Sequence, residues 1–117
     1  PHAFFEVGKI ARRDESDNEG CVTRNALGFF ESDRNVGFNE VSARVQALCY
    51  YLGVEIEPAE REDPRFISGR CAAVTVEGRE VGLYGEIHPE VLERWGIEMP
   101  CAACEIDLDE VLEYQEA

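Results

Sequence analysis

Residues 66–100 decide the fold, and their sequence is FISGRCAAVTVEGREVGLYGEIHPEVLERWGIEMP. The apolar and β-branched residues 70–76 predict one strand, and residues 81–87 predict a second strand. Between them, Glu77 and Gly78 supply the chemistry of a tight turn. This stretch therefore predicts an antiparallel hairpin at the centre of the chain.

A short helix is expected to follow this hairpin directly. Pro89 suits the first helical position because proline has no N–H to lose there, and Glu90 suits the positive end of the helix dipole. Trp95 lies near the expected end of the helix, and Gly96 is placed to close it in a left-handed conformation. A strand that runs into a helix N-terminus can carry chemistry, so this turn is the first candidate site.

The length of 117 residues and the hydrophobic content of 44% predict one globular domain over residues 1–117. No apolar run approaches the roughly 20 residues of a membrane span, and no signal-peptide pattern is present. We therefore expect a cytoplasmic location and no membrane partner. The chain begins at Pro1 and its single methionine is Met99, so we expect it to be a piece of a longer protein.

The formal net charge of -14 is extreme for this length, and Lys9 is the only lysine beside ten arginines. Such a charge argues against a phosphate-binding surface. It leaves two interpretations, which are an acidic interaction surface and adaptation to high salt, where ions screen the repulsion between acids. The acids are spread over the whole chain, so we favour a salt-adapted, halophilic source.

Five cysteines, an odd number, predict reduced and buried thiols in a chain without an export signal. An alternative is that Cys101 and Cys104 form half of a zinc site or a redox pair. Zinc would need two more ligands, and only Cys71 and His88 could donate, without paired spacing. We favour buried thiols and expect no metal ligand, and we keep a zinc-binding interaction domain as a third hypothesis.

The remaining segments complete a sheet with inserted helices. Residues 4–10 and 21–30 predict a second hairpin with a long polar tip, residues 54–58 a short strand, and residues 101–108 a last strand. Asp107 or Asp109 is expected to cap a terminal helix that runs through Tyr114. This order predicts an α+β fold, with an antiparallel sheet flanked by helices.

Residues 39–52 give the clearest helical pattern. Asn39 is the expected N-cap, with Phe38 before it as a hydrophobic staple, and Gly53 is the stop signal. The apolar side chains that recur at helical spacing are Val41, Val45, Leu48 and Leu52.

Four phrases carry a family resemblance: FFEVGK at residues 4–9, FISGRCA at 66–72, GLYGEIHPEVL at 82–92 and EIDL at 105–108. Taken in order, they cover nearly the whole chain and resemble the beta chain of phenylalanyl-tRNA synthetase, most closely its archaeal and eukaryotic type. The resemblance implies a truncated module that is shaped like a class II synthetase catalytic domain without being catalytic. It also implies packing against the alpha chain of that enzyme.

The parent enzyme implied by this resemblance attaches phenylalanine to its tRNA with ATP and magnesium. No cofactor is expected for this domain, and tRNA is expected to bind through the parent complex. Class II active sites hold ATP phosphates with two arginines, because the planar guanidinium meets phosphate oxygens in two places. Here the opening strand offers Glu6 and Lys9, and residues 85–91 carry Glu86 and Glu90 without a glycine repeat. We therefore expect no catalytic residues.

Assembly is the expected role, and its candidate interface is the apolar stripe of residues 39–52 together with Trp95. The alternative hypothesis is a free-standing paralogue that binds a small molecule such as an amino acid, in a shallow cleft beside Tyr84, Glu86 and His88. His88 could act there as a general base, but we favour a role in ending the strand and capping the helix.

Overall fold

The computed structural model describes residues 2–13 and 21–116, with side chains described for residues 25–112. Its elements, in chain order, are β1 (His2–Arg13), β2 (Cys21–Ser32), α1 (Phe38–Tyr51), β3 (Glu57–Glu60), β4 (Phe66–Val76), β5 (Arg79–Ile87), α2 (Pro89–Arg94), β6 (Cys101–Asp107) and α3 (Leu108–Glu116). The predicted α+β fold is confirmed. Among the described residues, no helix has both the length and the apolar character that crossing a membrane requires.

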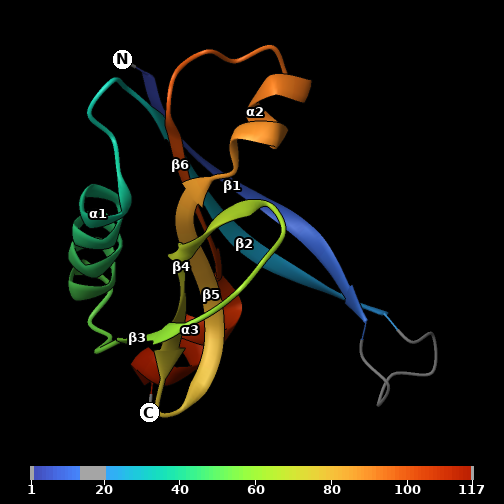
Figure 1. Cartoon of the computed structure of the whole chain (residues 1–117). Coiled ribbons are helices and arrows are strands. Elements are labelled where there is room, and N and C mark those ends of the chain that lie inside the picture. The colour runs from blue at the N-terminus through green and yellow to red at the C-terminus, as the bar shows by residue number, and fades with distance from the viewer. Residues whose placement is uncertain (1, 14–20, 117) are drawn as a thin grey trace.

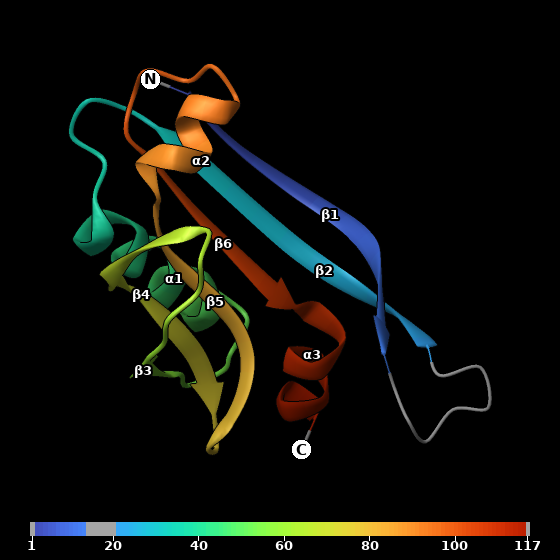
Figure 2. The same cartoon turned by 45° about the vertical axis from the view of Figure 1, so that its right-hand side comes forward.

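Six strands form one antiparallel sheet in the order β1-β2-β6-β5-β4-β3 (Figure 1). The two predicted hairpins, β1–β2 and β4–β5, are confirmed, and the last strand β6 lies between them. β6 pairs with β2 from Ala26↔Asp107 to Ser32↔Cys101, so residues 21–25 of β2 pair only with β1. Figure 2 shows β1 and β2 running on together past the end of β6. The predicted polar tip of this hairpin lies mostly at residues 14–20, outside the described residues.

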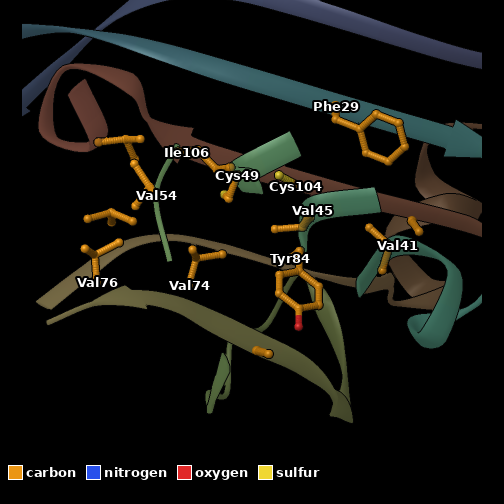
Figure 3. Packing of buried hydrophobic residues seen from close by; sticks show 14 of the residues in the cluster. Phe29, Val41, Val45, Cys49, Val54, Val74, Val76, Tyr84, Cys104 and Ile106 are labelled. Carbon is orange, nitrogen blue, oxygen red and sulfur yellow. The ribbon is translucent and has the colours of Figure 1, made fainter. Parts of the chain in front are cut away.

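Helix α1 covers one face of the sheet and builds the main core. Its buried residues are Val41, Val45 and Cys49, of which the two valines belong to the apolar stripe that the sequence predicted. They pack with side chains from the central strands, among them Tyr84 of β5 and Ile106 of β6 (Figure 3). Burying each such aliphatic side chain contributes about 1.5–3 kcal/mol. This packing fixes α1 against the sheet.

Both α1 and α2 end in the same glycine-dependent cap, as predicted. Gly53 has φ 75° after α1, and Gly96 has φ 71° after α2. In α1 the Gly53 N–H donates to the Tyr50 carbonyl and the Val54 N–H to the Cys49 carbonyl, both at 3.0 Å. The equivalent pair of bonds ends α2, and this is the Schellman motif.

Two local predictions are wrong. Helix α1 begins one residue before Asn39, with Gly37 at the N-cap and no side-chain cap. Phe38 is therefore helical, and its ring stacks on Tyr84 with the ring centroids 5.5 Å apart. The strand expected at residues 54–58 is shifted to Glu57–Glu60, because Val54 is held in the helix cap and its side chain is buried in the core.

The two aspartates that the sequence predicts as alternative caps of α3 have different hydrogen-bond partners in the structure. Asp107 is the cap, since its Oδ1 accepts a hydrogen bond from the Glu110 N–H at 3.1 Å. Asp109 instead accepts two hydrogen bonds from Asn25, from the backbone N–H at 2.7 Å and from Nδ2 at 2.9 Å. This clamp ties α3 to strand β2.

The turn between β4 and β5 contains backbone strain at Glu77, and this strain should be measurable as a loss of stability. Glu77 has φ 51° and Gly78 has φ 81°, the two positive values of a type I′ hairpin turn. Glutamate is strained there, whereas asparagine tolerates this conformation. We expect Glu77→Asn to raise the free energy of unfolding by about 0.5–1 kcal/mol in urea titrations. The control is Glu55→Asn, which removes the same charge from an exposed residue without a positive φ. Equal effects of the two substitutions would contradict the strain.

Candidate functional site

The turn from β5 into α2 is built around His88. This residue has an extended backbone (φ -61°, ψ 135°), and its Nδ1 accepts a hydrogen bond from the Glu90 N–H at 3.1 Å. Its own N–H donates to the Arg65 carbonyl at 2.8 Å. A ring nitrogen that accepts this bond must be unprotonated, so the Nδ1 atom is committed to the cap. The prediction that His88 ends the strand and caps the helix is confirmed.

Tyr84, Glu86 and His88 do not line one cavity. Tyr84 is fully buried beneath α1, and its hydroxyl lies 2.9 Å from the Ser42 Oγ. Glu86 Oε2 pairs with the Arg70 guanidinium at 3.2 Å. Of the three residues predicted to lie beside a shallow cleft, Tyr84 is packed in the core and His88 caps the helix, whereas Glu86 lines a cavity.

A cavity of about 540 Å³ lies beside this turn, between the ends of β4 and β5, helix α2 and the loop that follows it. The cavity has apolar walls and is also lined by the Arg70–Glu86 ion pair; the apolar residues include Ile67, Ile87, Leu92 and Met99. Glu93 and Glu98 add negative charge. Such a lining suits an apolar group far better than a polyphosphate.

A second strand-to-helix turn, from β6 into α3, lies outside the sites that the sequence predicts. It lies beside the β1–β2 hairpin, because β6 pairs with β2. Asp107 and Glu110 are both buried, and the Glu110 Oε1 pairs with the Arg79 guanidinium at 3.0 Å. Two carboxylates of this chain, those of Asp107 and Glu110, therefore lie at the start of α3. The acidic run at residues 107–110 was the signal that could have indicated it.

The predicted interface residues divide into two groups. Val41 and Val45 are at most 2% exposed and face their own sheet, so they cannot contact another chain while the fold is intact. Leu48 and Leu52 are partly buried against the same core. Trp95 is 60% exposed at the end of α2. Among these residues, only Trp95 presents a large surface to a partner.

The four described cysteines, Cys49, Cys71, Cys101 and Cys104, are buried and unpaired, which confirms that prediction for them; the Cys21 side chain lies outside the described part. Cys101 and Cys104 belong to two different apolar clusters, because residues three apart on a strand face opposite sides of the sheet. They cannot form the pair that a zinc or redox site needs. Among the described side chains, no three candidate metal ligands gather.

Comparison with known proteins decides the family. The family described as "Phenylalanyl tRNA synthetase beta chain CLM domain" matches residues 1–108. The chain belongs to this family. The phenylalanine–tRNA ligase beta subunit of Treponema pallidum is 42% identical over 112 residues, which are 96% of this chain and 18% of that protein. The same subunit of Borreliella burgdorferi is 38% identical over 96% of this chain and 20% of its own length.

The chain therefore spans about a fifth of the length of these curated relatives. The resemblance to this beta chain that the ordered phrases indicated is confirmed at the level of the family. The matched relatives are bacterial proteins.

The buried thiols predict a pH dependence of this domain's stability. Burial, with smaller contributions from Cys49 and Glu105, raises the pKa of the Cys104 thiol to about 12 from an ordinary 9.0. Between these values the unfolded chain loses a proton that the folded chain keeps, so stability is full below about pH 9 and falls as pH rises toward 12.

We expect Cys104→Ala to flatten this fall by up to about 1.4 kcal/mol per pH unit. Urea titrations at several pH values between 7.5 and 10.5 measure the slope for both proteins. Only the slopes are compared, because the substitution also leaves a small cavity. Identical slopes would show that the Cys104 thiol ionises normally in the folded state.

Proposed function

We propose that this chain is a non-catalytic structural module of a phenylalanine–tRNA ligase beta subunit. Its parent enzyme attaches phenylalanine to tRNA with ATP and magnesium, and the module contributes to assembly with the alpha chain. The family match and the names of the relatives support the parent. The observation that carries the non-catalytic role is that both strand-to-helix turns are occupied by groups of this chain itself.

A helix N-terminus binds phosphate when its N–H groups and its dipole are free to meet an anion. Here the Glu90 N–H is taken by His88 and the Glu110 N–H by Asp107. The carboxylates of Glu90 and Glu110 lie in the first turns and would repel a triphosphate. Neither turn suits ATP.

Three described arginines near these turns also form ion pairs within the chain. Arg70 pairs with Glu86, Arg79 with Glu110, and Arg65 with Asp63 at 3.0 Å. Hydrogen bonding from Arg65 holds the pKa of the Asp63 carboxyl below its ordinary value. A nucleotide would have to displace these carboxylates to gain a guanidinium, so the cost of binding rises further.

Finer parts of the proposal rest on the sequence. We assign the module to the class II architecture, in truncated form, and to the archaeal and eukaryotic type, on the four ordered phrases. We also propose a cytoplasmic location, tRNA contact through the parent complex rather than this domain, and an acidic surface suited to high salt. The antiparallel sheet with flanking helices supports the architecture.

A second candidate function is the binding of a small molecule, which the cavity of about 540 Å³ favours. Its apolar walls would accept the side chain of an amino acid such as phenylalanine, and its carboxylates would meet the ammonium group. Calorimetric titration of the beta subunit with phenylalanine separates this function from a purely structural role.

The non-catalytic role predicts that the full-length beta subunit, separated from its alpha chain, catalyses no ATP–pyrophosphate exchange. The assembled ligase supplies the positive control in the same assay. Exchange by the beta subunit alone, at a rate proportional to its concentration and lost on heating, would overturn the proposal.

The assembly role predicts an effect at Trp95. Buried tryptophans often dominate interfaces, so we expect Trp95→Ala to weaken association with the alpha chain at least tenfold, or about 1.4 kcal/mol. Analytical ultracentrifugation of the two subunits measures this affinity. The matched control is Leu112→Ala, because Leu112 is also an exposed apolar residue but lies on α3, which Figure 1 shows at the opposite end of the sheet from α2. An unchanged affinity for Trp95→Ala would exclude Trp95 from the interface.

A further inference from the structure

A groove of about 680 Å³ lies where the end of α1, the link into β3 and the β4–β5 turn meet. We call it the Tyr50 groove. Its main lining residues are Tyr50, Glu55, Ile56, Glu57, Pro58 and Glu77. These residues come from the end of α1, the segment leading into β3 and the β4–β5 turn, and Figure 1 shows that these elements lie away from α2.

An exposed aromatic pair stands at this groove. Tyr50 is 81% exposed and Tyr51 is 85% exposed, and their rings meet edge to face with the centroids 6.1 Å apart. Of the two, only Tyr50 lines the groove. Tyrosine rings offer a negative π face that attracts lysine and arginine side chains. The apolar surfaces of Ile56 and Pro58 can take the aliphatic stems of the same side chains.

All the charged side chains that line the groove are negative. Glu55, Glu57 and Glu77 are exposed, none of them forms an ion pair with a described residue, and no lysine or arginine lines the groove. Elsewhere in the described part, five arginines pair with acids: Arg44 with Glu31, Arg61 with Glu80, Arg65 with Asp63, Arg70 with Glu86, and Arg79 with Glu110. No described lysine or arginine meets these carboxylates, so the groove would suit a cationic group from outside the described residues.

We propose that the Tyr50 groove docks a basic protein segment from elsewhere in the assembled ligase, an inference that rests on the proposed function. The relatives are about five times longer than this chain, so most of the protein that could supply the segment lies outside these residues. RNA does not fit, because its phosphates would meet three carboxylates without a counter-ion.

The contact is made by side chains rather than by strand addition. β3 is an edge strand of the sheet, which could in principle accept another strand. Its four residues include Pro58, which has no N–H to offer. Lysine and arginine side chains that lie over Tyr50 and reach the glutamates fit this edge better than a backbone ladder.

The test uses a carbodiimide, which joins carboxylates to lysines in direct contact, on the assembled alpha–beta ligase. Lys9 is the only lysine in the 117 residues, so a cross-link from Glu55, Glu57 or Glu77 to any other lysine identifies a residue outside this chain. We expect such cross-links, with a yield that falls as KCl is raised. Tyr50→Ala should lower the yield at least fivefold, whereas Tyr50→Phe should keep it.

The matched control is Tyr51→Ala, which removes an equally exposed ring that does not line the groove and should leave the yield unchanged. Hydroxyl-radical footprinting gives a second readout that also detects an arginine-only segment, and Tyr50 should oxidise at least fivefold more slowly than Tyr51 in the ligase.

Several outcomes would overturn the inference: cross-links to Lys9 alone, equal yields for Tyr50→Ala and Tyr51→Ala, or no cross-link together with equal oxidation of the two tyrosines. Failure of the beta subunit to assemble with an alpha chain refutes the proposed function instead. In that case, cross-linking and footprinting of the beta subunit alone test whether the groove binds a basic segment.

Discussion

Strand β5 imposes the constraint on which the rest of the structure depends. Its two neighbours approach so closely that a Cβ at Gly82 would collide with the Glu105 carbonyl oxygen, and a Cβ at Gly85 with the Arg70 carbonyl oxygen. Glycine is therefore required at both positions. Between them, Tyr84 holds α1 through its ring and its hydroxyl. The same strand then delivers His88 to the start of α2, so sheet, core and helix cap share one element.

The starts of α2 and α3 are capped by side chains of this chain, and three arginines near them are paired with acids. Both features disfavour the binding of a phosphate group. A class II active site would need open N–H groups and free guanidinium groups, whereas here the Glu90 and Glu110 N–H groups and the Arg70 guanidinium have partners within the chain. Two described features that other molecules could reach, Trp95 and the Tyr50 groove, are apolar or acidic. Such surfaces suit contacts with protein. The unusual acidity is thus compatible with a salt-tolerant surface and, at one place, with a specific electrostatic contact.

Local chemistry predicted much of this fold, because several element ends depend on one residue. Gly96 adopts the left-handed conformation that the sequence predicted, and Gly53 and the Glu77–Gly78 turn end a helix and reverse a hairpin where the sequence placed them. Predictions failed where distant contacts decide. The start of α1 depends on Phe38 meeting Tyr84, and the position of β3 depends on its pairing with β4. For the site, helical spacing showed that Val41 and Val45 share an apolar face, but it could not show whether a partner or the chain's own sheet covers that face.

The position of β6 has a consequence for how the chain folds during synthesis. The two hairpins join neighbouring segments and can form early, but Ala26 of β2 pairs with Asp107, about eighty residues further along. The sheet cannot close until β6 has left the ribosome and entered between β2 and β5. Until then, each half exposes an unpaired strand edge, on β2 in one hairpin and on β5 in the other. The last strand to be made is therefore the one that joins the two halves, and the nascent domain depends on its timely arrival to avoid pairing with other chains.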